Sequence, residues 1–211
     1  MPDDMTQATW VDESLNKEAL RIIDLGSAAE AVRFFMEGVE ACDKEQMRRA
    51  LDVLESTGAQ PRAFQRLKKL TPTDDVRKSF RSFWDVYGWT IRMKVADDSA
   101  LCDALRNLLE PYKGPPMTLY RGEIAAKHDK GNYGISWTTD IKAARMFARG
   151  LNCLEPAGGV LLESLVPAEA IISPPSEHSR FLQEDEFLVN ARGLDEVRVL
   201  KRYPWTEWRI D

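Results

Sequence analysis

The stretch Lys113-Gly114-Pro115-Pro116 divides this 211-residue chain into two parts with different patterns. Glycine and proline in succession interrupt both helices and strands, so we expect a structural boundary here. Before the boundary, apolar residues recur at helical spacing, and beyond it the chain consists of short apolar runs typical of strands. The sequence therefore predicts an α+β fold, in which a helical region over residues 1–113 packs on a compact, mostly β region over residues 114–211.

The helical region carries the start and stop signals of individual helices. Ser27 and Glu30 form a capping box before one helix, and Asp43 can cap the next, which Gly58 can end. Further helices are expected over residues 61–70, 74–95 and 99–109. Gly88 weakens the longest of these locally, because glycine is a poor helix former.

The second region contains six short apolar runs that we interpret as strands, with one helix among them. The helix is expected over residues 140–149, because Asp140 can cap its start and Gly150 can end it. The strands are expected over residues 117–121, 134–138, 160–166, 170–173, 186–190 and 197–203.

Composition narrows the classes of function. With 44% hydrophobic residues the chain can bury one sizeable core. A net charge of −5 gives no global field that favours nucleic acid. No stretch approaches the roughly 20 apolar residues of a membrane span, and the polar start Met1–Met5 does not resemble a secretory signal. We therefore expect a cytoplasmic protein without membrane contact.

Cysteine and histidine usage argues against a metal centre. The cysteines Cys42, Cys102 and Cys153 are far apart and odd in number, which fits neither a disulfide framework nor a zinc site. Two histidines, His128 and His178, are too few for a histidine-based site. We expect reduced thiols and no bound metal.

Three short polar motifs follow one another on the predicted strands. They are Arg121-Gly122 at a strand end, Ser136-Trp137-Thr138 within a strand, and Glu184-Asp185-Glu186 at the start of a strand. Strand alternation puts the two hydroxyls on one face and the two glutamates on one face. Each motif alone has an ordinary explanation: a surface arginine, a half-buried strand or a solvated strand face.

Taken in this order, the motifs resemble the R-S-E class of mono-ADP-ribosyltransferases. The resemblance covers the second region only, since the helical region carries none of the family's motifs. It implies an ADP-ribosyltransferase-like split β-sheet core, NAD as co-substrate and release of nicotinamide.

The resemblance also implies roles for single residues. Arg121 would hold NAD near its diphosphate and ribose, and the backbone of Gly122 would meet the nicotinamide amide, with the missing side chain allowing close approach. Ser136 would help to hold the catalytic glutamate and the ribose, and Thr138 would brace the site. The family usually has threonine where this chain has Trp137, whose side chain we expect to face away from NAD.

The helix after the second motif carries a further candidate. Phe147 matches a family aromatic that stacks on nicotinamide, although a core position on an amphipathic helix explains it nearly as well. Arg145 and Arg149 flank it and either meet phosphates or are solvated.

The two glutamates would carry the chemistry. Breaking the bond between ribose and nicotinamide builds positive charge on the sugar, and Glu186 would stabilise that charge as the family's catalytic carboxylate. Glu184 would orient the acceptor. A glutamate there resembles the arginine-modifying branch, because a guanidinium with a pKa above 12 needs a carboxylate partner.

The segment 173–182 precedes these acids and reads as an ordered loop, because it is rich in proline and serine. In the family the loop at this place recognises the acceptor. The candidate contacts here are His178, Arg180 and Phe181.

The leading hypothesis is thus an NAD-dependent mono-ADP-ribosyltransferase, of a bacterial or phage toxin or effector kind, with an inhibitor or antitoxin protein as a further partner. The acceptor is either a protein arginine or a nucleobase. A basic face of the helical region keeps nucleic acid open; it comprises Arg62, Arg66, Lys68, Lys69, Arg77, Lys78 and Arg81. The alternatives are an NAD glycohydrolase, and an inactive transferase-like fold that binds a protein.

Two aromatic groups remain. Trp84, Tyr87 and Trp89 are candidates for an aromatic wall of the NAD cleft, with core packing expected for at least two of them. The tail 203–208, Tyr-Pro-Trp-Thr-Glu-Trp, is expected either to dock on the helical region or to bind a partner.

Overall fold

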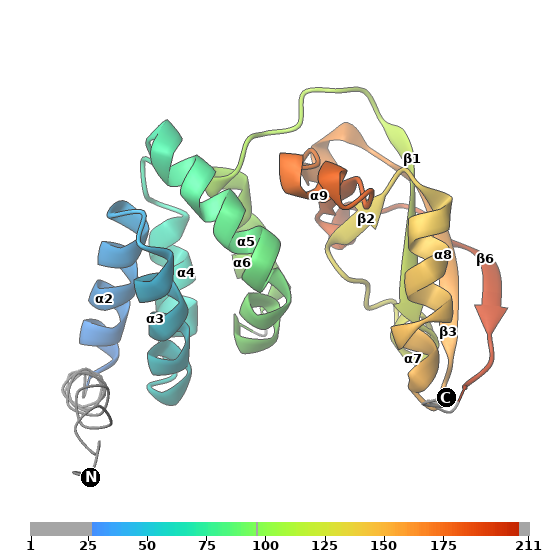
Figure 1. The fold of residues 1–211 in the computed structure, drawn as a ribbon, viewed down its shortest axis with the longest axis horizontal. Coiled ribbons are helices and arrows are strands. Elements are labelled where there is room, and N and C mark those ends of the chain that lie inside the picture. The colour runs from blue at the N-terminus through green and yellow to red at the C-terminus, as the bar shows by residue number, and fades with distance from the viewer. Residues whose placement is uncertain (1–26, 96, 207–211) are drawn as a thin grey trace, which may run out of the picture.

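The computed structural model describes residues 27–95 and 97–206 and shows an α+β fold (Figure 1). The segment Met1–Met5 and the last tail residues, Glu207 and Trp208, lie outside the described residues. The helical region consists of α2 (Ala28–Glu40), α3 (Lys44–Ser56), α4 (Gln60–Leu67), α5 (Asp74–Val95) and α6 (Asp98–Leu108).

The predicted helix signals are confirmed. Ser27 and Glu30 bond reciprocally, with 3.2 Å from the Glu30 backbone nitrogen to Ser27 Oγ. Asp43 accepts from the Gln46 backbone at 2.9 Å. Helix α5 continues through Gly88, because the Trp84 ring fills the space beside it: a β-carbon at this glycine would lie 2.8 Å from the indole.

The second region forms one antiparallel sheet in the order β4-β5-β2-β1-β3-β6. Its strands are β1 (Met117–Ile124), β2 (Ser136–Thr138), β3 (Gly159–Val166), β4 (Ile171–Ser173), β5 (Glu186–Val189) and β6 (Arg198–Tyr203). In the middle of the sheet a single register pair, Tyr120 with Thr138, joins β1 to β2. The sheet therefore consists of two three-stranded parts that meet at one point.

Helices complete the second region. The predicted helix appears as α8 (Ile141–Arg149), capped by Asp140. The expected loop over 173–182 is wrong in part, because Ser176 caps a short helix there by accepting from Ser179 at 3.0 Å. Short elements that the sequence did not predict are α7 (Ala125–His128), α9 (Glu177–Phe181), η1 (Leu151–Leu154), η2 (Ala168–Ala170) and η3 (Ala191–Gly193).

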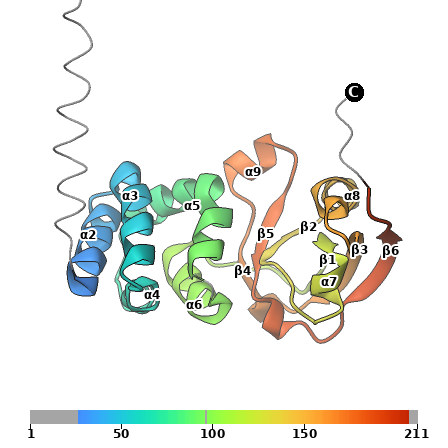
Figure 2. The same ribbon diagram turned by 90° about the horizontal axis from the view of Figure 1, so that it is seen from below.

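The helical region packs directly on the sheet. Figure 2 shows α5 and α6 beside the β4–β5 edge, and the helical core takes in Ile135, Ile172 and Leu188 from the other region. Arg106 also donates to the Glu169 carbonyl at 2.6 Å. A second core on the opposite face of the sheet contains Trp137. The cleft described below lies where the two regions meet.

All three cysteines are free, and Cys42 is half-buried while the other two are buried. Within residues 27–95 and 97–206, no helix is both long and apolar enough to cross a bilayer.

Candidate functional site

A cleft of about 1150 Å³ opens between α5, α6 and the strands β1, β2 and β5. It brings together the seven residues of the motifs and of the following helix to which the resemblance assigned roles in NAD binding or catalysis. These are Arg121, Gly122, Ser136, Thr138, Phe147, Glu184 and Glu186. The three motifs thus meet in space, although more than sixty residues separate the first from the last.

Glu186 and Ser136 are placed by the pairing of β5 with β2. Thr138 lies opposite Glu186, so alternation brings Ser136 to the same face, where its hydroxyl is near enough to the Glu186 carboxylate to affect the pKa of that group. The Glu186 side chain is 24% exposed. Trp137 points to the opposite face and is buried there, as predicted.

The ionisation of Glu186 reflects its partial burial. Desolvation raises the pKa of this carboxyl above its ordinary value. The Ser136 hydrogen bond and the nearby Arg81 lower the pKa, whereas Asp85 and Glu184 raise it, and the net shift is upward.

Glu184 lies in a turn and not on the strand, so the expectation that both acids share one strand face is wrong. Strand β5 begins only at Glu186, and the residues on either side of Glu184 have positive φ: 58° at Gln183 and 42° at Asp185. Such left-handed residues cost about 1–3 kcal/mol each and concentrate at functional sites. The turn still aims Glu184 into the cleft.

Ser179 of helix α9 holds this turn in place. Its carbonyl accepts from the Glu184 backbone at 3.0 Å, and its hydroxyl accepts from the Glu186 backbone at 2.7 Å. The side chain is buried. Sequence reasoning missed this residue, because a serine in a Pro- and Ser-rich segment gives no sign of which backbone it will meet.

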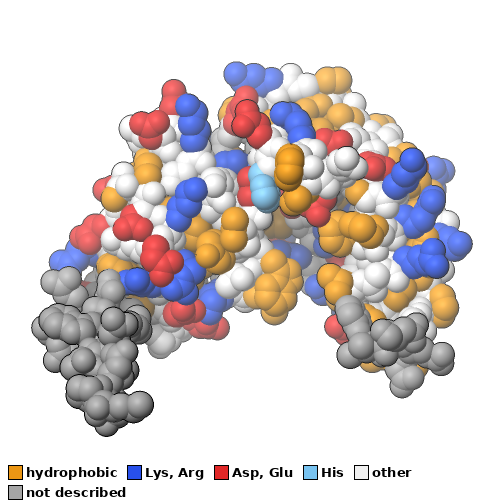
Figure 3. All heavy atoms as spheres, viewed as in Figure 1, with side chains coloured by type: hydrophobic (Ala, Val, Ile, Leu, Met, Phe, Trp, Pro, Cys, Tyr) orange, Lys and Arg blue, Asp and Glu red, His pale blue; other side chains and the backbone are white. Residues whose placement is uncertain are grey.

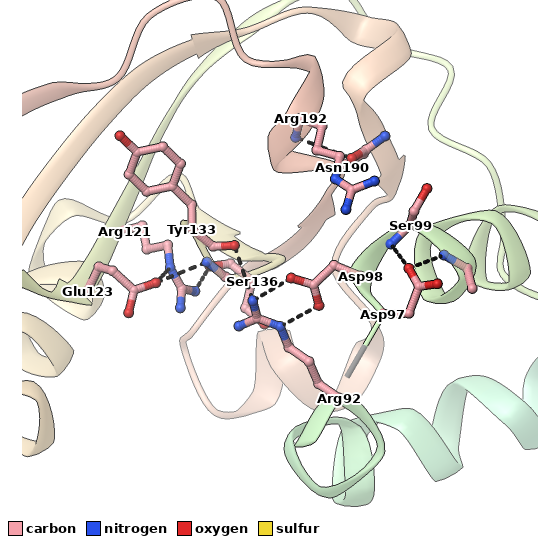
Figure 4. Close-up of polar contacts among 12 residues, drawn as sticks. Arg92, Asp97, Asp98, Ser99, Arg121, Glu123, Tyr133, Ser136, Asn190 and Arg192 are labelled. Carbon is pink, nitrogen blue, oxygen red and sulfur yellow. Dashed lines mark hydrogen bonds and ion pairs between the residues drawn. The ribbon is translucent and has the colours of Figure 1, made fainter. Parts of the chain in front are cut away.

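Arg121 is engaged within the protein. Its Nε donates to Glu123 at 2.8 Å and its Nη1 to the Ser136 carbonyl at 2.5 Å (Figure 4). Glu123 in turn accepts from the backbones of Ile124 and Gly134, each at 2.9 Å. These bonds tie β1 to the segment 134–136, where the sheet has little backbone pairing.

Glu123 is the buried partner that the sequence did not reveal. Burial by itself would raise the pKa of this carboxyl, but Arg121 and the two backbone N–H groups outweigh that effect and lower it. The position of Arg121 in this ion pair also explains why residue 134 is a glycine, since a β-carbon there would lie 1.9 Å from Arg121 Nη2.

Gly122 has a different role from the one expected. A β-carbon at this position would lie 2.3 Å from the Ala148 nitrogen and 2.4 Å from the Ala144 carbonyl oxygen. The space beside the glycine is therefore filled by helix α8, and not kept free for a ligand. Gly122 lets α8 pack closely on β1, which brings Phe147 to the cleft.

The aromatic candidates separate into cleft and core. Phe147 is 38% exposed and lines the cleft, which argues against a core position. Trp89 on α5 also lines the cleft and is 77% exposed. Trp84 is buried and Tyr87 packs against the helical core, which confirms the expectation for at least two of the three.

Arg81 is the contribution of the helical region to the acid site. The sequence placed it on an exposed basic face, but its side chain is only 14% exposed. Its Nη2 lies 3.8 Å from Glu186 Oε2, and its Nε lies 3.0 Å from Asp85 Oδ1. In the described part of the chain, neither of these nitrogens makes a well-formed hydrogen bond. A half-buried arginine thus faces the candidate catalytic carboxylate.

A second arginine from α5 closes the cleft on the helical side. Arg92 grips Asp98 with two hydrogen bonds of 2.9 and 2.7 Å, and it reaches the Tyr133 carbonyl at 3.2 Å (Figure 4). The hydrogen bond to Asp98 raises the pKa of Arg92 and lowers that of Asp98. This contact bridges the two regions at the cleft.

The predicted acceptor contacts lie outside the cleft. His178, Arg180 and Phe181 are on α9 and exposed, with Phe181 82% exposed. None of the three lines the cleft. They are connected to it through Ser179, which holds the acids.

The predicted basic face of the helical region does not form as a continuous surface. Besides the burial of Arg81, Lys68 pairs with Asp103 at 2.7 Å, and Arg77 bonds the Asn107 carbonyl at 2.6 Å. The arginines of this set serve partly to hold the helices together.

The aromatic tail does not dock on the helical region over its described residues. Tyr203 and Pro204 lie beside α8, and the Thr206 backbone donates to the Cys153 carbonyl at 2.9 Å. The tail up to Thr206 therefore follows the second region.

Comparisons with protein-family models, with curated proteins and with solved structures found no match to this chain. The described residues contain no group of three or more His, Cys, Asp or Glu side chains placed to hold a metal ion. The chemistry of the cleft is therefore argued from its own side chains.

Proposed function

We propose that this protein is an NAD-dependent mono-ADP-ribosyltransferase, which transfers ADP-ribose to a macromolecular acceptor and releases nicotinamide. One observation carries the proposal: Ser136 and the half-buried Glu186 lie on paired strands and line the same cleft as Arg121 and Phe147. This is the set of groups that the R-S-E resemblance requires. The meeting of two sheet halves at β1 and β2 supports the proposed split-sheet core.

The cleft suits the reaction. The bond between ribose C1′ and the nicotinamide nitrogen breaks, and its electron pair leaves with nicotinamide. Positive charge then develops on the sugar, where a partly desolvated Glu186 carboxylate stabilises it better than in water. The Ser136 hydroxyl, on the same face of the paired strands, would orient that carboxylate.

Arg121 retains donors for an anion. A guanidinium has five N–H donors, and the contacts with Glu123 and the Ser136 carbonyl occupy only part of them. Lys127 and Arg192 add two cations to the lining of the cleft. A diphosphate in the cleft would thus meet positive charge from three sides of the second region.

Acceptor attack forms the new bond to C1′, and the acceptor loses a proton. Glu184 is placed to orient the acceptor and to take that proton, since it lines the cleft beside Glu186. The second candidate is an NAD glycohydrolase, in which water replaces the acceptor. It is favoured by one observation, namely that the α9 side chains lie outside the cleft.

The test uses purified protein, NAD labelled in its adenylate part and a bacterial lysate. Nicotinamide release that requires the lysate, with label entering material sensitive to protease or nuclease, supports the transferase. Release at the same rate without lysate identifies the glycohydrolase. Absence of both NAD binding and nicotinamide release overturns the proposal and leaves a binding module.

The matched pair of variants is Glu186→Gln and Glu40→Gln. Glu40 is an exposed glutamate at the end of α2, remote from the cleft. Glu186→Gln should abolish nicotinamide release while it retains NAD binding, and Glu40→Gln should behave as the wild type. Normal turnover by Glu186→Gln would refute the site.

A further inference from the structure

A second groove, of about 730 Å³, lies between α8 and β6, away from the cleft. Its lining combines four cationic side chains with an apolar floor and contains no Asp or Glu. The lining residues are Ile141, Arg145, Arg149, Leu161, Leu200, Lys201, Arg202, Tyr203 and Pro204. Figure 3 shows Lys and Arg side chains gathered in this part of the surface, over α8 and β6.

The charge of this groove is only partly used within the protein. Arg202 pairs with the exposed Asp129 at 2.7 Å, and Lys201 lies over the Tyr203 ring with 5.3 Å to its centroid. Arg145 and Arg149 are exposed and make no ion pair within the described residues. The whole chain has a net charge of −5, so this groove is a local cationic surface on an acidic protein.

Helix α8 is unusual for a merely solvated helix. From Ile141 to Arg149 it contains Lys142, Arg145 and Arg149 but no acidic residue. These cations are spaced three and four residues apart, where like charges repel each other by tenths of a kcal/mol. A polyanion bound along the helix would turn that repulsion into attraction.

The apolar floor of the groove favours polyanions that also carry exposed apolar or aromatic groups. Leu161 is buried there, and Leu200 and Tyr203 remain partly open to solvent between the cationic edges. A single strand of nucleic acid can place bases on apolar and aromatic side chains and phosphates on the edges. A duplex keeps its bases inside and would leave the floor unused.

We propose that the groove between α8 and β6 binds single-stranded nucleic acid. Arg145, Arg149 and Lys201 would hold the phosphates, and Tyr203 would meet a base. The binding rests on the groove alone. Helix α8 separates the groove from the cleft that Phe147 lines, and a helix is only about 10 Å wide. Under the proposed function, a bound strand is therefore delivered close to the acids as the acceptor.

The test measures fluorescence anisotropy of a labelled mixed-sequence oligonucleotide over a series of salt concentrations. Arg145→Ser/Arg149→Ser is compared with Arg62→Ser/Arg66→Ser. The control removes the same charge with the same spacing, from exposed positions on α4. The groove variant should bind about tenfold more weakly than the wild type. The slope of log binding constant against log salt concentration should also be less steep by about 1–2, while the control stays near the wild type.

Four results would overturn this inference. The first is failure of the wild type to bind the oligonucleotide at low salt, and the second is an equal loss of binding in the two double variants. The third is tighter binding of a duplex than of a single strand, and the fourth is displacement of the strand by polyglutamate at equal charge, which would indicate a site for acidic peptides. Binding of NAD in the absence of nucleic acid is measured in parallel, and both double variants should retain it. Its absence from the wild type would count against the proposed function and leave the binding result standing.

Discussion

The two walls of the cleft contribute to the site in different ways. The sheet wall supplies Arg121, Ser136 and Glu186, which stand in short motifs on strands. Behind the helical wall, α5 supplies Arg81, which faces Glu186 and pairs with Asp85 although neither residue lines the cleft itself. The R-S-E resemblance made the first set recognisable in the sequence, whereas the second is defined only by packing between the regions. The sheet wall thus provides the reacting carboxylate, and the helical wall adjusts its ionisation.

The sharpest test of this division is Glu186→Gln. Nicotinamide release should fall by about 100- to 1000-fold or more, because stabilisation of the sugar cation is lost. The folded-state pKa of Glu186 is raised, so its contribution to stability is present below its unfolded pKa and is lost as pH rises. Glutamine does not ionise, and the variant should therefore melt higher than the wild type at neutral pH. A lower melting temperature at neutral pH would contradict this view of the acid site.

Glu184→Ala separates the two acids within the sheet wall. Transfer to an acceptor should fall by about 100-fold, the lower end of what a positioned proton acceptor contributes, while some hydrolysis of NAD remains. Product analysis of the labelled nucleotide measures both activities in one reaction. Equal loss of transfer and hydrolysis would assign Glu184 to the stability of its turn.

Glu123→Gln tests whether Arg121 also holds the sheet together. Removal of one charge from this largely buried pair should destabilise the fold by about 3 kcal/mol at neutral pH. The folded-state pKa of Glu123 is lowered, so its contribution is present above the unfolded pKa and is lost as pH falls. The difference from the wild type should therefore shrink on acidification, as followed by urea unfolding.

Asp103→Asn is the matched control for that experiment. It breaks the exposed pair with Lys68 and should cost less than about 1 kcal/mol. Similar losses in the two variants would mean that burial gives the Arg121–Glu123 pair no special weight.

The smallest expected effect concerns the helical wall. Arg81→Gln removes a cation that lowers the pKa of Glu186, and Asp85→Asn removes an acid that raises it. The acid limb of the pH profile for nicotinamide release should move to higher pH in the first variant and to lower pH in the second. Arg62→Gln, on the exposed face of α4, should leave it in place. Shifts in the same direction would show that α5 acts only as a scaffold.

The sequence predicted elements well where the pattern was local. The apolar period over residues 74–95 gave the bounds of α5, and Asp140 and Gly150 marked the ends of α8. The α+β class also follows from such patterns, whereas the grouping of the motif residues around one cleft was implied by the resemblance.

What the sequence did not predict depends on neighbours far along the chain. Arg81 was taken as an exposed cation because nothing near it in sequence reveals Glu186. Gly122 was assigned to ligand approach, although the helix that packs on it begins nearly twenty residues later. Glu123 and Ser179 are ordinary in sequence and acquire roles only through the backbones they meet.

The single register pair between β1 and β2 also determines which backbone amides lose their protection against hydrogen exchange first. Each three-stranded part has its own ladder, whereas the seam between them depends on Tyr120–Thr138 and on the Arg121 and Glu123 side chains. Amide hydrogens of residues 134–136 should therefore exchange with deuterium before those of the β1–β3 ladder. Because Arg121 lies on one side of this seam and Glu186 on the other, the first local opening of the sheet would divide the candidate site itself.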